Sequence, residues 1–452
     1  MSETKNRKLY IESLGCAKNQ VDSEVIVENL RQDGWCLTED ISEADLVVVN
    51  TCGFIESAKQ QSLDTVFQLR KQAPENARFI IGGCLAQRYP DDLFESIPEA
   101  DGVFGNRDLG QIASFADKVM KQGKRSELVP QYPEDLHAEF DQRSKLLGWP
   151  GSAYLKISEG CNHRCHYCAI PVIRGDLRSR PEDLILADAK ALVDRGIKEI
   201  NVIAQDLAAY GMDSTPGGRF LELLEKIADI PGDFRIRLLY IHPDIFPMGL
   251  LDLMKRQPKI LHYFDIPMQH ANARVLKAMG RTGNPEIYYN LISKIREALP
   301  DAVIRTTLML GFLEEDDEAF EELCAFVRRC RFDWMGSFTY SREEDTPAYS
   351  LRTEEEQKKM EPIARRRQKK LEKIQERITS EQLQKFVGNQ YEVLIEEKFK
   401  DEDLAIGRIY SQAPDVDGQT VVMGTGLIPG QLCRCGIRKV AGVDLDAVKI
   451  DD

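Results

Sequence analysis

The strongest constraint on the fold is an alternation of short apolar runs and longer helical stretches. In the N-terminal part the apolar runs are KLYIESLGC, ADLVVVNTC and RFIIGGC, and helical patterns cover 22–34 and 56–72 between them. Strands that alternate with helices predict a parallel sheet with helices on its faces. We therefore predict a parallel α/β domain over residues 1–125.

The alternation resumes after a segment rich in proline and charge, 126–147, which we interpret as a linker. Six candidate strands follow: AYLKIS, EINVIAQD, RIRLLY, HYFDIP, VIRTTLML and WMGSFTY. Six β/α units are too few for a closed eight-stranded barrel. The pattern therefore predicts an open, partial (β/α)6 TIM-like barrel, which together with one long charged helix over 353–385 forms a domain at 148–385.

The C-terminal residues 386–452 change to short β-rich runs separated by Asp-Gly and Pro-Gly turns, which favours a small closed, OB-like β-barrel. Such modules often bind nucleic acid, but from Gly388 onward this one has twelve acidic and seven basic residues. The whole chain carries a net charge of −14, and this field repels polyanions. A local basic patch could still bind RNA, but a basic partner protein is the easier inference.

The chain has eleven cysteines, an odd number, and its N-terminus MSETKNRKLY has no apolar signal region. No apolar run approaches the roughly 18 residues of a membrane span. We therefore expect a cytoplasmic protein with reduced thiols that serve as metal ligands, catalytic groups or packing residues. The cysteines that we interpret as packing residues are Cys36, Cys324 and Cys330.

Three cysteines end the three apolar runs of the N-terminal domain: Cys16, Cys52 and Cys84. We call them the strand-end trio. An isolated cysteine is most often a small buried hydrophobic residue. However, the carboxyl ends of parallel strands line one edge of a sheet, where ligands bind. The three positions therefore predict one shared site.

Three further cysteines, Cys161, Cys165 and Cys168, lie in CNHRCHYC directly after the strand AYLKIS. We call them the loop trio. An iron–sulfur cluster normally takes four thiolates, so three would leave one iron open to a small molecule. The alternatives are a redox C-x-x-C pair, a zinc site completed by His163 or His166, and three structural cysteines. The three-thiolate cluster is the favoured interpretation.

CNHRCHYC, with its C-x3-C-x-aromatic-C form and Tyr167 in the aromatic position, resembles the signature of radical S-adenosylmethionine (SAM) enzymes. The resemblance implies a [4Fe-4S] cluster on the loop trio whose open iron binds SAM, with Tyr167 close to this cofactor. Reductive cleavage of SAM would give a 5′-deoxyadenosyl radical. SLGCAKNQVDSE, NTCGFIESAK and GGCLAQRY resemble the N-terminal domain of methylthiotransferases, which implies a second [4Fe-4S] cluster on the strand-end trio.

Within the methylthiotransferases, SLGCAKN, NTCGFIESAK, IPMQHANARVLKAMGR and GRIYSQAPDVDG are similar to the RimO type, and the C-terminal module looks like a TRAM domain. The resemblance implies methylthiolation of the β-carbon of an aspartate in the twelfth protein of the small ribosomal subunit. The alternatives are a tRNA adenosine methylthiotransferase of the MiaB type and an iron–sulfur or zinc scaffold that docks on the ribosome. The implied partners are this basic protein, free or assembled, a reducing electron donor and a sulfur donor, whereas a membrane or tRNA is not expected.

Three of the candidate strands place polar residues where the cofactor is expected. Gln205 and Asp206 end the strand EINVIAQD, and the resemblance suggests that they lie near SAM, although capping of the next helix is an equal alternative. Arg305, within VIRTTLML, would need a partner such as the cofactor carboxylate if it points into the barrel, but the helix-facing orientation stays open. Gln269 and His270 follow HYFDIP, and His270 either lines the cavity or is a hydrogen-bonded structural histidine.

Overall fold

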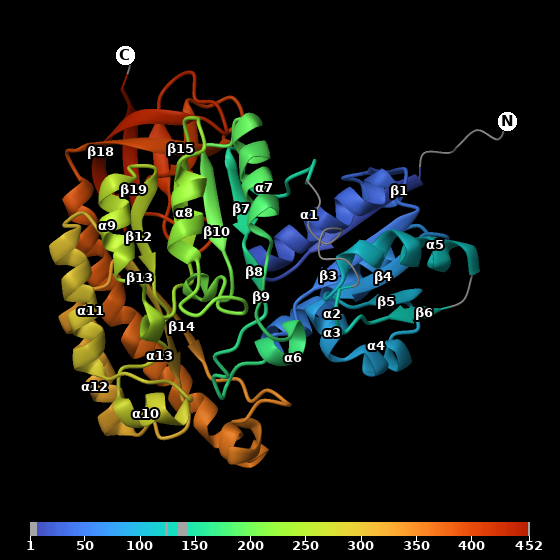
Figure 1. The fold of residues 1–452 in the computed structure, drawn as a ribbon, viewed down its shortest axis with the longest axis horizontal. Helices are drawn as coiled ribbons and strands as arrows, with labels where there is room; N and C mark the ends of the chain where they lie inside the picture. The colour runs from blue at the N-terminus through green and yellow to red at the C-terminus, as the bar shows by residue number, and fades with distance from the viewer. Residues whose placement is uncertain (1–6, 123–124, 134–142, 451–452) are drawn as a thin grey trace. The chain divides into compact units, whose positions relative to one another are not determined.

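The computed structural model describes residues 7–122, 125–133 and 143–450, and the chain forms two compact units (Figure 1). The first unit extends to Leu147 and also includes 159–162 and 169–188, while the second contains the rest. The part of the predicted linker at 134–142 lies outside the described residues. None of the described helices is long and apolar enough to cross a membrane.

The first unit is built on a six-stranded parallel sheet with the strand order β2-β1-β3-β4-β5-β6. The strands are β1 (Arg7–Ser13), β2 (Trp35–Leu37), β3 (Leu46–Thr51), β4 (Arg78–Gly83), β5 (Gly102–Phe104) and β6 (Ser126–Leu128). The predicted parallel α/β domain is therefore confirmed. β2, β5 and β6 were not predicted, because three residues are too few to show an alternating pattern.

Helices cover both faces of this sheet: α1 (Ala17–Gln32), α2 (Glu56–Gln72), α3 (Cys84–Arg88), α4 (Pro90–Ser96) and α5 (Ile112–Gln122). Successive residues of β3 point to opposite faces, so Val48 packs with α1 and α5, whereas Val47 and Val49 pack with α2, α3 and α4. Both faces are buried, which explains why the strand is a continuous apolar run rather than an alternating one.

The central sheet of the second unit has six parallel strands in the order β14-β13-β12-β11-β10-β7 and does not close, which confirms the open (β/α)6 barrel. The strands are β7 (Ser152–Lys156), β10 (Glu199–Ile203), β11 (Arg235–Leu239), β12 (Ile260–Asp265), β13 (Val303–Leu310) and β14 (Trp334–Thr339). The helices between them are α7 (Glu182–Asp194), α8 (Phe220–Ala228), α9 (Gly249–Arg256), α10 (Ala273–Ala278), α11 (Pro285–Ala298) and α12 (Asp317–Cys330).

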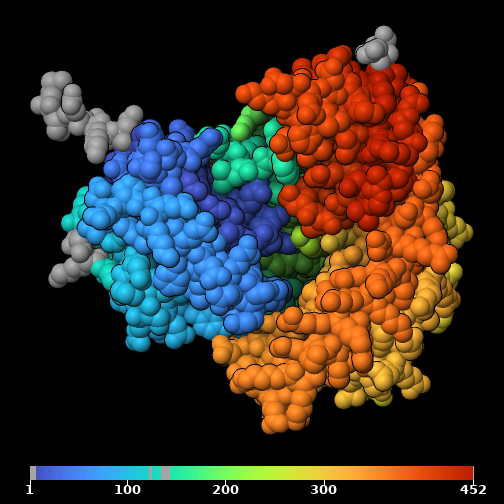
Figure 2. Space-filling view, turned by 180° about the vertical axis from the view of Figure 1, so that it is seen from behind, coloured from blue at the N-terminus to red at the C-terminus, as the bar shows by residue number. Residues whose placement is uncertain are grey.

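The long charged helix is also confirmed, as α13 (Glu354–Leu383). It begins with a capping box in which Thr353 and Glu356 satisfy each other's backbone N–H groups. Ala364, Leu371 and Ile378 recur every seven residues and are buried, so this stripe packs α13 on the barrel while its other faces meet solvent. The orange surface of α13 lies below the red C-terminal barrel in Figure 2.

The C-terminal module is a closed barrel with the strand order β15-β16-β17-β19-β18, as predicted. Its strands are β15 (Gln390–Lys398), β16 (Leu404–Arg408), β17 (Thr420–Met423), β18 (Leu432–Ala441) and β19 (Asp444–Lys449). A closed barrel leaves no free sheet edge. The last strand, β19, was not predicted, because the final β-rich run recognised in the sequence, QLCRCGIRKVAG, ends before it.

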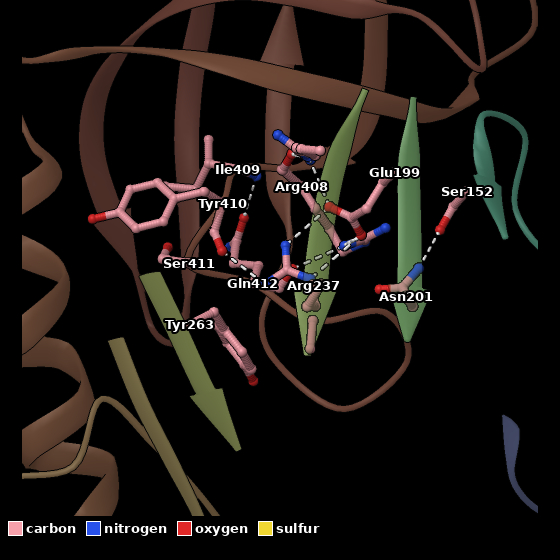
Figure 3. Close-up of polar contacts among 12 residues, drawn as sticks. Ser152, Glu199, Asn201, Arg237, Tyr263, Arg408, Ile409, Tyr410, Ser411 and Gln412 are labelled. Carbon is pink, nitrogen blue, oxygen red and sulfur yellow. Dashed lines mark hydrogen bonds and ion pairs between the residues drawn. The ribbon is translucent and has the colours of Figure 1, made fainter. Parts of the chain in front are cut away.

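A buried cluster of ion pairs joins the C-terminal barrel to the partial barrel (Figure 3). Glu199, at the start of β10, accepts hydrogen bonds from Arg235, Arg237 and Arg408. Although burial alone would raise it, the three guanidiniums hold the pKa of Glu199 well below its usual range. Arg237 also donates to the carbonyl of Tyr410 at 2.7 Å. The loop after β16 is therefore held against the inner strands of the partial barrel.

The packing role predicted for three cysteines is confirmed for Cys324 and Cys330, which are buried, and is wrong for Cys36, which is exposed. The reason is the alternation along β2, where Trp35 is buried and Cys36 points to solvent.

Candidate functional site

The structure brings the strand-end trio together at one edge of the first sheet. β1, β3 and β4 are adjacent, and their register pairs Ser13 with Asn50 and Thr51 with Gly83. Cys52 and Cys84 therefore directly follow paired positions. Cys16 is the N-cap of α1 and so lies at the positive end of the helix dipole.

Two glycines allow this convergence. Gly15 has φ +96°, and a Cβ at this position would lie 2.9 Å from Cys52 Cβ. Gly83 has φ +93°, and a Cβ there would lie 2.2 Å from Asn50 Oδ1. Only glycine adopts such a backbone without strain. The Gly-Cys pairs at the carboxyl ends of β1 and β4 thus turn the chain sharply and leave space for the neighbouring groups.

The environment of Cys84 is polar although the residue is buried. Its Sγ donates to Asn19 Oδ1 at 3.2 Å and accepts from Asn106 Nδ2 at 3.4 Å and from Arg174 Nη2 at 3.5 Å. Burial raises the pKa of Cys84, and Arg174 opposes this shift. Burial, together with the charge of Cys84, raises the pKa of Cys52 to about 12. The raised pKa values favour the protonated form of both thiols. A bound metal cation would stabilise the thiolate form instead.

Arg174, the last residue of α6 (Ile170–Arg174), anchors this environment. Its guanidinium is buried and binds Glu159 at 3.0 Å, Asp22 at 2.7 Å and Asn19 Oδ1 at 2.7 Å. These neighbours raise the pKa of Arg174 well above its usual value, against the effect of burial. The sequence analysis missed this residue, because its partners are 15 to 155 positions away along the chain and no local pattern marks it.

The loop trio lies between β8 (Ser158–Glu159) and α6. The backbone N–H of Cys161 donates to Gly175 O at 3.2 Å, and that of Cys168 donates to Cys165 O at 3.0 Å. All three thiols are partly exposed. A segment without regular secondary structure thus presents three cysteines to an incoming group.

The described residues offer no alternative single-ion site: within them no three His, Cys, Asp or Glu side chains converge closely enough to hold one metal ion. Such convergence is what the zinc interpretation of the loop requires. A cubane cluster places each thiolate on a different iron and so takes sulfur atoms that lie farther apart. Three thiols on one short loop, and three at neighbouring strand ends, fit this second kind of group.

The aromatic residue of the loop is packed rather than free. The ring of Tyr167 meets Phe312 edge-on at a centroid distance of 6.0 Å. Burial raises the pKa of Tyr167, and the nearby Arg281 opposes the shift. Arg281 is itself fixed by hydrogen bonds to Pro267 O and His242 Nε2, each 2.8 Å long. Tyr167 therefore braces the loop against the partial barrel.

Asp206 connects the loop to the carboxyl end of β10. It accepts from His163 Nε2 at 2.6 Å and from the backbone N–H groups of Ala208 and His242. The rings of His163 and His242 stack at 4.0 Å. Burial and Arg281 lower the pKa of His242 to about 2, so this ring is neutral. The capping alternative for Asp206 is therefore observed, since its side chain caps the next turn and also holds His163 of the loop, while contact with SAM stays a prediction.

Two glutamines at strand ends carry unused polar atoms. Neither Oε1 nor Nε2 of Gln205, after β10, has a hydrogen-bond partner among the described residues, and the same holds for Oε1 of Gln269, after β12. Buried polar atoms are nearly always paired, so these fit a polar ligand at the carboxyl edge of the barrel. His270 is fully buried: its Nδ1 accepts from the N–H of Asn272, and its Nε2 has no hydrogen-bond partner among the described residues.

Arg305 points into the partial barrel and has partners from the protein itself. Its Nη1 donates to Asp265 at 3.0 Å and to Thr307 at 3.1 Å, and its Nε lies 3.3 Å from Asp417 of the C-terminal barrel. No hydrogen bond within the described residues engages Nη2. The inward orientation is therefore the one adopted, and binding of the cofactor carboxylate stays a prediction.

Comparisons with known proteins agree with the three-part organisation. Residues 8–105 match the family described as "Uncharacterized protein family UPF0004", residues 155–327 match the radical SAM superfamily, and residues 387–450 match the TRAM domain. The solved structure of the radical SAM methyltransferase TsrM from Kitasatospora setae is similar in fold, with a TM-score of 0.57 and 15% identity over 76% of this chain and 77% of that one.

Curated relatives named "Ribosomal protein uS12 methylthiotransferase RimO" match nearly end to end. The relative from Treponema denticola is 40% identical over 96% of this chain and 99% of its own length. That from Citrifermentans bemidjiense is 40% identical over the full length of both chains. The predicted family is confirmed, and with it the transferase class and [4Fe-4S] clusters and SAM as cofactors. The chain is a member of the RimO family of radical SAM methylthiotransferases.

Proposed function

We propose that this protein replaces a hydrogen on the β-carbon of an aspartate in ribosomal protein uS12 with a methylthio group. The observation that carries the proposal is the presence of two cysteine trios in one chain, one at the strand ends of the first unit and one in the loop before α6. A radical SAM enzyme that only cleaves SAM needs one trio. A second site is required where sulfur is delivered as well.

In this proposal the strand-end trio holds the auxiliary cluster and the loop trio holds the cluster that binds SAM. When bound, these groups and SAM would supply the radical, the sulfur and the methyl group. The protein positions them: Arg174 gives the buried thiols a positive neighbour, and the polar environment of Cys84 suits a charged ligand set. The N-terminal domain assigned to 1–125 serves the auxiliary cluster, and the domain at 148–385 serves the radical chemistry.

The cofactor-facing residues divide into two roles. We assign direct contacts with SAM to Tyr167, to Gln205, whose amide is otherwise unpaired, and to Arg305 through Nη2. We assign a positioning role to Asp206, because both of its oxygens are already used by His163 and by two backbone N–H groups. Packing around Tyr167 and Phe312 excludes water from this side of the barrel.

Charge favours a protein substrate at the C-terminal module, 386–452. A pocket of about 460 Å³ between this barrel, β14 and α13 is lined by six carboxylates and one guanidinium: Glu372, Glu376, Glu396, Asp415, Asp417, Asp444 and Arg408. Complementary charge steers a basic partner onto such a surface, and ribosomal proteins are basic. A cytoplasmic location, a reducing electron donor and a sulfur donor follow from the same proposal.

The test is anaerobic reconstitution with iron and sulfide, followed by incubation with SAM, a reductant and purified uS12, free or in small ribosomal subunits. We expect mass spectrometry of uS12 to show one methylthio group on a single aspartate. Bulk tRNA is the parallel substrate. Methylthiolation of tRNA adenosine in place of uS12, or SAM cleavage with neither product, would contradict the proposal.

A further inference from the structure

A strongly basic groove lies on the second unit, outside the site described above. α12 and α13 lie side by side (Figure 1) and enclose a groove of about 840 Å³. Seven of its ten lining residues are cationic and one is acidic: Arg328, Arg331, Arg366, Lys369, Lys370, Lys373, Arg377 and Glu381. We call it the α12–α13 groove. In a chain with a net charge of −14, such a concentration of cations is not explained by average composition.

The cations on α13 follow the helical period. Arg366, Lys370, Lys373 and Arg377 are separated by three or four residues, so they form a single stripe along one face of α13. At 1.5 Å per residue the stripe is about 16 Å long. Glu372 and Glu376 belong to the acidic pocket on another side of the same helix. The basic stripe and these two carboxylates thus lie on different faces of α13.

Internal ion pairs neutralise only part of the groove. Lys370 pairs with Glu321, and Arg331 and Arg377 share Glu381. For the other four cations, no hydrogen bond or ion pair to the described residues exists, and all four are exposed: Arg328, Arg366, Lys369 and Lys373. Like charges this close on a helix surface destabilise it. The excess charge therefore points to an anionic partner.

We infer that the α12–α13 groove docks the ribosomal RNA that surrounds uS12 in the small subunit, so that the protein acts on uS12 in its RNA-bound form. The inference rests on the proposed function for its choice of RNA. Phosphate backbones are the extended anions that lysine and arginine clusters bind. The basic protein uS12 would itself be repelled from this groove, whereas the acidic pocket on the other side of α13 would attract it.

One further observation favours RNA over a membrane surface. None of the exposed large hydrophobic residues of the described chain lines the groove, and Ile374 and Ile378 are the only apolar residues among those that line it, so it offers little of the exposed apolar surface that membrane binding combines with basic residues. The overall negative charge does not prevent local binding, because exposed charges more than about 8–10 Å apart are largely screened at physiological salt.

The experiment compares two variants with equal changes in charge. The groove variant replaces the four unpaired cations, R328Q/R366Q/K369Q/K373Q. The control variant replaces four exposed, unpaired lysines elsewhere in the described chain: Lys71, Lys118, Lys294 and Lys400, each by glutamine. None of the eight belongs to the proposed cofactor site. Binding of the cluster-loaded proteins to purified small subunits, to RNA extracted from these subunits and to bulk tRNA is measured over a range of salt concentrations.

We expect the groove variant to bind small subunits and their RNA at least about tenfold more weakly, with a log–log salt slope shallower by about 3. The control variant should bind within about twofold of the wild type. Methylthiolation of free uS12 should be unchanged in both variants. Equal losses in the two variants, no loss in the groove variant, or tighter binding of tRNA than of small subunits would overturn the inference.

The binding measurement also separates this inference from the proposed function, because it requires no turnover. Salt-sensitive, groove-dependent binding of small subunits without any modification of uS12 would support the groove and contradict the proposed function. Modification of free and assembled uS12 by the groove variant at wild-type rates would support the proposed function and contradict the groove.

Discussion

The two cysteine trios reach similar chemistry by opposite routes. The strand-end trio is collected from three neighbouring strands of one sheet and runs from the exposed Cys16 through Cys52 to the buried Cys84, whereas the loop trio occupies eight consecutive residues and all three of its thiols are partly exposed. The first site exists only when the sheet is folded, since residues far apart in sequence must meet. The second is set by local turns and bracing contacts. Burial of Cys84 favours a group that is held permanently, whereas three partly exposed thiols on one loop allow a cofactor to enter.

Removal of either trio gives the largest expected effect and separates the two roles. Alanine at all three positions of the loop trio should lower the iron content from about eight to about four per chain and abolish both SAM cleavage and methylthio transfer. Alanine at all three positions of the strand-end trio should remove the other four irons and abolish transfer, while SAM cleavage continues. Iron analysis and chromatography of 5′-deoxyadenosine check both variants.

The opposite pattern would break the comparison. If the strand-end variant lost SAM cleavage while it retained about four irons, the two sites would not be functionally separate. If the wild type held about four irons, the strand-end cysteines would be packing residues.

The next largest effect concerns the buried charge beneath the strand-end trio. Arg174→Met leaves Asp22 and Glu159 buried without their cation. Loss of one partner in a buried ion pair costs about 3–5 kcal/mol, so we expect the first unit to unfold at markedly lower denaturant concentration and to lose its iron. Hydrogen exchange of the β3 and β4 amides in the full chain measures this locally.

The matched control is Lys121→Met, which breaks the ion pair of an exposed lysine with Asp117 on α5 of the same unit. Exposed pairs contribute little, so exchange in β3 and β4 should not change. If Arg174→Met also left exchange and iron content unchanged, the network beneath the trio would have no structural role.

Acid should affect the surroundings of the loop trio through His242. The pKa of this ring is lowered from 6.5 to about 2 by burial and by Arg281. Between these two pH values the imidazole of His242 is protonated in the unfolded chain but not in the folded chain. The stability contributed by the neutral ring is present above pH 6.5 and is lost as the pH falls from 6.5 toward 2, by up to about 1.4 kcal/mol per pH unit.

Denaturant unfolding of wild type and His242→Gln at pH 7.5 and pH 5 measures this dependence. Glutamine does not titrate, so the variant should lose about 1–2 kcal/mol less than the wild type between these two pH values. An equal loss in both proteins would mean that His242 is not the group that responds.

Sequence patterns predicted what is periodic or local and missed what depends on distant contacts. All six strands of the partial barrel and the helix α13 follow from apolar runs and caps. α1 begins at Ala17, five residues before the predicted helix, because its polar first turn is buried beneath the trio, where Asn19 bonds to Leu14 O and Thr51 O. Arg174 has no local signal at all. The cysteines could be found from sequence, but the charges that support them required the folded chain.

The smallest effect distinguishes a positioning residue from a cofactor contact at the carboxyl end of β10. In Asp206→Asn the amide oxygen can still accept from the N–H groups of Ala208 and His242, but His163 loses a charged partner at 2.6 Å. We expect a loss of stability of about 1 kcal/mol and SAM affinity within about twofold of wild type.

Gln205→Leu should show the reverse, unchanged stability with SAM binding about tenfold weaker, because its amide is unpaired in the protein and a ligand hydrogen bond is worth about that factor. Isothermal titration with SAM and denaturant unfolding give both values. If Asp206→Asn weakened SAM binding as much as Gln205→Leu, Asp206 would contact the cofactor directly. The same carboxylate would then hold both SAM and His163 of the loop.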